Sequence, residues 1–231
     1  MRNSGTGGRA SRDDVCMRRA KAAELLRLAA GGFEKLKFVQ TLEGDRTELA
    51  ALYAFGPGLD TPEGADLLDI AVALDLPPDQ APWRCAPLAW RTAAEYLRLD
   101  RRAVRLAWRS ARIEVANHRI RRPLRFWSAA QGTDENAIAA FAVGNHDQLR
   151  AAEPPPALRA ERLTEELAVS LAHLRETEAR YYDRDWRREH KGDGYHPEHA
   201  LHDAVSGYLD LLAATQESGP LPVADAANGI Q

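Results

Sequence analysis

The feature that most constrains the fold is a stretch between Pro87 and Pro123 that contains no Gly and no Pro. Within this stretch arginine recurs at every seventh residue, namely at Arg91, Arg98, Arg105, Arg112 and Arg119. The residues that precede these arginines form a second row, which is mostly apolar: Trp90, Leu97, Val104, Ala111 and His118. An uninterrupted run with a regular apolar row is typical of a helix. The pattern predicts one long helix over about 87–121, with a buried stripe and an arginine face beside it.

Most of the remaining chain also has helical spacing of its apolar residues. A first helix is expected to begin near Ser11 and to stop at Gly31-Gly32, because a glycine pair is a common helix end. Thr61, Pro62 and Glu63 form a good helix start, which Leu67, Ile70, Ala71 and Leu74 continue at helical spacing. A second long helix is predicted over about 157–190, and a last helix opens at Pro197.

No segment shows the period-two alternation of β-branched residues that marks a strand. The sequence therefore predicts an all-α fold, a single irregular helical bundle of about seven to eight helices. Its two long helices cover about 87–121 and 157–190. The predicted domain spans residues 12–218, between disordered tails at 1–11 and 219–231.

Charge is distributed unevenly along the chain, although the net charge is only -3. Residues 84–125 hold twelve arginines against Glu95, Asp100 and Glu114, whereas residues 43–79 hold nine acids and only Arg46. Such asymmetry indicates either a nucleic-acid surface or two parts of one fold that neutralise each other. Both interpretations remain open at this point.

An arginine face suits phosphate groups, because the planar guanidinium group binds them bidentately. The favoured interpretation is a non-enzymatic protein, or a subunit of a nucleoprotein complex, that contacts the backbone of RNA or DNA. The predicted contacts are Arg91, Arg98, Arg101, Arg102, Arg105, Arg109, Arg112 and Arg119. The alternative is a helical scaffold or regulatory subunit that binds an acidic protein partner or forms a homo-oligomer.

A second patch interleaves aromatic residues with arginines between Arg180 and Arg188, a mixture that stacks bases and binds phosphates. It adds Arg187 and Arg188 to the predicted nucleic-acid contacts. In the same patch, Arg184 followed by Asp185 and His190 resembles the R-x(4–6)-H signature of HEPN-type ribonucleases, which are small all-α domains. The resemblance implies a ribonuclease alternative in which Arg184 and His190 act on RNA.

Several further classes of function receive little support from the sequence. His196, His199 and Asp203 are candidate ligands for a divalent ion, but their spacing does not match the two-histidine zinc motif, so no metal or cofactor is expected. Cys16 and Cys85 form no disulfide framework, and no signal peptide or run of about 18 apolar residues is found. We therefore expect a cytoplasmic protein with no membrane contact, and the evidence for an enzyme is weak.

Overall fold

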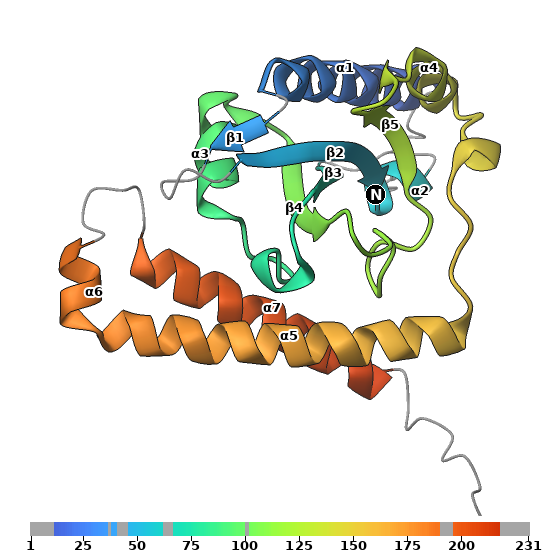
Figure 1. Ribbon diagram of the computed structural model, residues 1–231. Coiled ribbons are helices and arrows are strands. Elements are labelled where there is room, and N and C mark those ends of the chain that lie inside the picture. Colours follow the sequence, from blue (N-terminus) through green and yellow to red (C-terminus); the bar gives the residue numbers. More distant parts are fainter. Residues whose placement is uncertain are drawn as a thin grey trace, which may run out of the picture.

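Strands 2 to 6 of the computed structural model form a mixed sheet in the order β4-β3-β2-β5-β6, and β1 also pairs with β2 (Figure 1). The structure describes residues 12–36, 38–40, 46–61, 67–99, 102–189 and 196–217. The strands are β1 (Phe38–Gln40), β2 (Arg46–Phe55), β3 (Leu68–Leu74), β4 (Val104–Ser110), β5 (Leu124–Ser128) and β6 (Gly132–Thr133). The helices are α1 (Arg12–Leu36), α2 (Pro57–Asp60), η1 (Pro78–Gln80), α3 (Leu88–Tyr96), α4 (Glu135–Val143), η3 (Asp147–Leu149), α5 (Pro156–Tyr182), α6 (Arg184–Glu189) and α7 (Pro197–Glu217). The prediction of an all-α helical bundle is therefore wrong, and the fold is mixed α/β.

The central strand β3 explains why the pattern of apolar residues did not predict the sheet. All seven of its residues are buried, since β2 pairs with it on one side, β4 pairs with it on the other, and both faces are covered. A strand buried on both faces has a continuous apolar run instead of alternation. In such a run Ile70, Ala71 and Leu74 also satisfy helical spacing, which produced the wrong prediction of a helix after Thr61.

The predicted helix over 87–121 is also wrong, because only Leu88–Tyr96 is an α-helix within it. The helix ends as Leu97 and then Arg98, which has a left-handed φ of 54°, turn the chain away from the helix axis. The chain then returns as β4, parallel to β3 and in register from Leu68 opposite Val104 to Leu74 opposite Ser110. Because β4 is a strand, successive side chains point to opposite faces of the sheet.

Helices cover both faces of the sheet, as Figure 1 shows with α1 and α4 on one side and α5 and α7 crossing on the other. The first layer buries Leu26, Ala30 and Phe33 of α1 with Ile138 and Phe141 of α4. The second layer packs Leu163 of α5 and Leu211 of α7 against a smaller cluster that includes Phe55, Ala71, Trp83, Ala107 and Ile120. The sheet thus separates two helical layers.

Two other predicted boundaries differ from the structure. Helix α1 continues through Gly31-Gly32 to Leu36 instead of stopping there. The second long helix is present as α5, but it ends at Tyr182, and the short α6 follows it. The predicted tails at 1–11 and 219–231 lie outside the described residues, as does His190.

Candidate functional site

Most of the eight arginines predicted to contact nucleic acid from the segment 87–121 are held individually by acidic side chains of the fold. Five of them make ion pairs at 2.5–2.9 Å: Arg91 with Asp203, Arg105 with Asp69, Arg109 with Glu166, Arg112 with Asp75, and Arg119 with Asp210. Two of these acids, Asp69 and Asp75, belong to the acidic segment 43–79, and the other three lie on α5 and α7. No continuous arginine face exists in the described residues.

Arg105 of β4 and Asp69 of β3 form an ion pair between neighbouring strands of the sheet. Arg105 Nε and Nη2 donate to the two carboxylate oxygens at 2.5 and 3.0 Å, and this contact raises the pKa of Arg105 above its ordinary value. The Asp69 side chain is only 3% exposed. Gly56, with a φ of +73°, lies so close that a Cβ there would be 2.8 Å from Asp69 Oδ2. Asp69 is thus enclosed by the fold and neutralised by Arg105.

Arg109 lies between the sheet and α5, where its side chain is 2% exposed. Its Nη2 donates to Glu166 Oε1 at 2.6 Å, and the other oxygen of Glu166 accepts from Asn117 Nδ2 at 3.1 Å. A guanidinium group in this position cannot reach an external phosphate. The predicted nucleic-acid contact at Arg109 is instead a contact between two layers of the fold.

Asp210 of α7 joins the helical layer to the sheet layer. Its carboxylate accepts from Trp83 Nε1 at 2.7 Å and from Arg119 Nη2 at 2.6 Å, and it contacts His118 Nε2 at 3.1 Å. Burial alone would raise the pKa of Asp210, but these hydrogen bonds outweigh it and hold the pKa well below the ordinary value. Burial lowers the pKa of His118, which favours its neutral form.

The second predicted patch is exposed and paired mainly within itself. Arg188 lies 3.3 Å from Asp185, and the guanidinium group of Arg187 lies over the Tyr181 ring at 5.5 Å. Arg184 is exposed on α6, and His190, the other residue of the predicted ribonuclease pair, lies outside the described residues.

The candidate metal ligands near the start of α7 do not converge. The rings of His196 and His199 lie 5.2 Å apart, but Asp203 is directed to Arg91 of α3. Within the described residues, no group of three or more His, Cys, Asp or Glu side chains could hold a metal ion.

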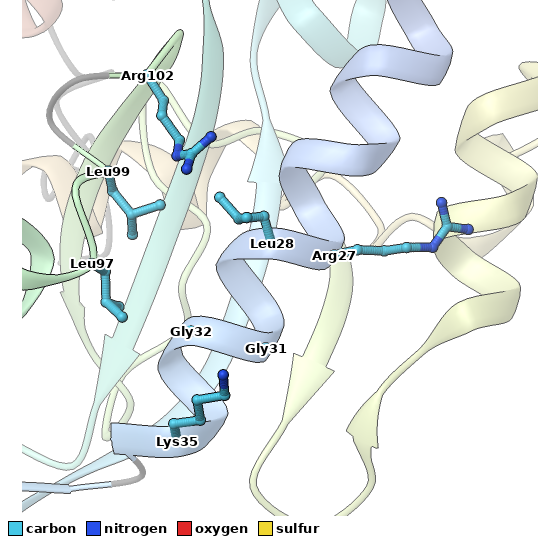
Figure 2. Close-up of a pocket in the computed structure, with 8 residues that line it drawn as sticks. All are labelled: Arg27, Leu28, Gly31, Gly32, Lys35, Leu97, Leu99 and Arg102. Atoms are coloured by element: carbon cyan, nitrogen blue, oxygen red, sulfur yellow. The ribbon is translucent and has the colours of Figure 1, made fainter.

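A hollow of about 310 Å³ lies between α1 and the segment that connects α3 to β4 (Figure 2). Its lining residues are Arg27, Leu28, Gly31, Gly32, Lys35, Leu97, Leu99 and Arg102. We call this hollow the basic groove. Leu28 and Leu97 provide most of its apolar surface, and Leu28 is 41% exposed although it lies beside the buried core, whereas Leu99 is only 1% exposed. An exposed leucine in a concave site indicates a surface that can bury apolar groups of a ligand.

The rim of the basic groove is positively charged. Its described lining residues include Arg27, Lys35 and Arg102 and no acid, although Figure 2 shows the Arg27 side chain directed away from Leu28, Leu97 and Leu99. Arg27 is partly neutralised by Glu135 at 2.9 Å, with both side chains substantially exposed. Lys35 and Arg102 form no ion pair with another described residue, and Figure 2 shows both side chains at the groove.

A second hollow of about 220 Å³ shares Leu99 with the basic groove. It lies between α3 and β4 and is lined mainly by apolar residues, which include Val104, Leu106 and Trp108. Arg91 and Glu95 line it as well, so its charged residues are of both signs. Leu99 therefore connects two neighbouring hollows on the same side of the sheet.

Among the described lining residues of the basic groove, sequence reasoning predicted a binding role only for Arg102, and as a contact for nucleic acid. Leu97 was assigned to the buried stripe of a long helix, and Gly31-Gly32 was interpreted as a helix stop. Two signals were available: a glycine pair inside an otherwise helical pattern, and the positive charges of Arg27 and Lys35 four residues before and after Gly31. Arg101, another predicted contact, lies outside the described residues.

The described helices include none that is long and apolar enough to cross a membrane. Comparison with curated proteins and with solved structures gave no match. A family model described as a domain of unknown function, DUF7711, matches residues 17–217. Since this match covers most of the 231 residues, the chain belongs to the DUF7711 family.

Proposed function

We propose that this protein is a non-catalytic binding subunit that holds an acidic segment of a protein partner in the basic groove. The observation that carries the proposal is an aliphatic surface of Leu28 and Leu97 beside Lys35 and Arg102, with no acid among the lining residues that the structure describes. The free thiol of the buried Cys85 supports the cytoplasm, a reducing compartment, as its location.

The chemistry of the groove favours a protein segment that combines aliphatic and acidic side chains. Leu28 and its neighbours would remove apolar groups from water, which contributes about 25 cal/mol per Å² of apolar surface buried. Lys35 and Arg102 would select carboxylates at the rim, because they form no ion pair among the described residues. Complementary charge of this kind raises the association rate and excludes basic partners.

Nucleic acid is a poorer match to the same groove. Five of the ten predicted arginine contacts are ion-paired to acids of other elements. Among its described lining residues, the groove has no aromatic side chain on which a base could stack, and such stacking contributes to the affinity for single strands. Aliphatic side chains contribute little to binding of a phosphate backbone.

A peptide selection tests the proposal with the full chain. A phage-displayed library of random peptides would be selected on the immobilised protein, and labelled forms of the enriched peptides titrated by fluorescence anisotropy. We expect enriched sequences with several acids and with Leu, Ile, Val or Met. Lys35→Glu and Arg102→Glu should each weaken binding about tenfold, which corresponds to about 1.4 kcal/mol.

Lys21→Glu is the matched control, because Lys21 is exposed on α1, lies outside the groove, and gives the same change in charge as Lys35→Glu. It should leave binding unchanged. Enriched peptides without acidic residues, or binding that survives both groove substitutions, would refute the proposal. So would single-stranded RNA or duplex DNA that binds more tightly than every enriched peptide and is released by the same substitutions.

A further inference from the structure

Gly31 occupies a helix interior, where glycine is normally unfavourable. It lies within α1, and its φ is not among the positive values of the described glycines. Any L-residue can adopt an α-helical backbone, so the conformation does not require glycine. Alanine at a helix-interior position is the more stable residue.

Packing inside the protein does not require glycine at this position either. A Cβ added to Gly31 would meet no heavy atom within 4 Å. Gly207 of α7 is the opposite case, because a Cβ there would lie 2.2 Å from the carbonyl oxygen of Trp83. At the neighbouring Gly32, a Cβ would touch the Leu97 side chain at 3.1 Å, on the opposite wall of the groove.

The open space beside Gly31 is the basic groove itself. Gly31 is one of its lining residues, and Figure 2 shows it between Leu28 and Lys35 on α1. A methyl group at this position would lie in open space beside the hollow and would meet no atom of the core. Glycine at such a site exposes the helix backbone, which allows another backbone to approach closely.

We infer that Gly31 is a contact and specificity residue of the basic groove, at which the acidic partner segment lies directly against the backbone of α1. This inference rests on the proposed function. The aliphatic side chains of the segment contact Leu28 and Leu97, and its carboxylates lie towards Lys35 and Arg102. A side chain at position 31 would separate the two backbones and displace these contacts.

The inference predicts opposite effects of Gly31→Ala on stability and on binding. The melting temperature should rise by about 2–4 °C, because alanine is the better helix former and meets no clash. Binding of a peptide from the selection should weaken severalfold. Gly31→Leu, which fills the hollow, should weaken binding by more than tenfold while the protein remains folded by circular dichroism.

Ala168→Leu is the control for added bulk on an exposed helix, because Ala168 lies on α5 in the other helical layer. It should leave peptide affinity unchanged. Unchanged affinity in Gly31→Leu, together with loss of binding in Lys35→Glu, would refute the role of Gly31 and leave the proposed function in place. Unchanged affinity in both variants would refute both. A lower melting temperature in Gly31→Ala would show that the position is required for packing and would also overturn the inference.

Discussion

Replacement of Arg109 by methionine is expected to lower the free energy of unfolding by about 3–5 kcal/mol, because it leaves a buried carboxylate without its cation. The two side chains are almost fully removed from solvent, with 2% of Arg109 and 11% of Glu166 exposed, and they are joined at 2.6 Å. After the substitution, Glu166 would retain only the hydrogen bond from Asn117. Since a domain is typically stable by about 5–15 kcal/mol, such a loss is a large fraction of the total.

Arg112→Met is the matched control, since Arg112 is also paired at 2.9 Å but with Asp75 at the surface. More than half of each side chain is exposed, at 54% and 58%. A pair of this kind contributes about 0–1 kcal/mol. The two arginines lie three residues apart, so the comparison isolates burial from the type of residue.

A double variant separates the loss of the pair from the cost of an unpaired charge. Glu166→Leu alone should destabilise strongly, because it leaves the buried guanidinium group without an anion. Arg109→Met combined with Glu166→Leu should recover most of the loss, since apolar replacement of a buried pair is often close to neutral.

Urea unfolding followed by circular dichroism gives the free energies, provided that the denaturant slope is unchanged among the variants. If Arg109→Met unfolds within about 1 kcal/mol of the parent, the guanidinium group does not carry a buried charge, and the reasoning from its burial is wrong. The same result would reopen Arg109 as a contact for an external phosphate.

Three further predictions concern single groups. Because the pKa of Asp210 is depressed in the folded state, its carboxylate stabilises the fold above pH about 4, and this contribution is lost as the pH falls towards the folded-state pKa. The parent protein should therefore lose more unfolding free energy between pH about 4 and about 2 than the Asp210→Asn variant does. Burial raises the pKa of the Cys85 thiol to about 12, so iodoacetamide at pH about 8 should label the Cys85 peptide only in denaturant. Mass spectrometry measures the labelling, and rapid labelling of the native protein would contradict the burial of Cys85. Arg98→Gly should raise the unfolding free energy by about 1 kcal/mol, because it relieves a φ of 54°, whereas an equal gain in Arg98→Ala would exclude this cause.

The parts of the fold that the sequence predicted are helices that bury one face only. Helix α5 has Leu163 buried and Leu167 and Leu174 half-buried at helical spacing, whereas Thr164, Glu165, Ala168 and Ala172 between them are exposed. The sheet was missed because β3 is buried on both faces and therefore carries no alternation. The spacing of apolar residues shows which face of a helix or strand is exposed to solvent. It cannot identify an element such as β3, which has no solvent-exposed face.

The spacing of residues in β4 was ambiguous for a geometric reason. Residues four apart lie on one face of a helix, and residues an even number apart also lie on one face of a strand. Val104 and Trp108, and likewise Arg105 and Arg109, satisfy both conditions. A seven-residue repeat would distinguish a helix from a strand, because residues seven apart lie on one face of a helix but on opposite faces of a strand. The arginine repeat, however, spans α3, β4 and the loops and belongs to no single element.

The basic groove could not be derived from local patterns, because its two walls come from segments far apart in the sequence. Residues 27–35 form one wall, and Leu97, Leu99 and Arg102 form the other. Which residues of α1 face this second wall depends on the packing of α1 against the sheet, and a sheet was not predicted. The sequence shows the pair Gly31-Gly32, but their position in a groove wall can be inferred only when it is known that α1 continues beyond them.

The charge asymmetry along the chain reflects contacts within the fold more than an external partner. Five of the twelve arginines in the segment 84–125 are neutralised from two directions, by Asp69 and Asp75 before it and by acids of α5 and α7 after it. Charges that are segregated in sequence are therefore interleaved in space. The cations that remain informative about binding are those that the fold leaves unpaired among the described residues, and Lys35 and Arg102 are two of these at a concave apolar surface. Counting arginines along the chain did not point to the basic groove, whereas subtracting the internal pairs leads to it.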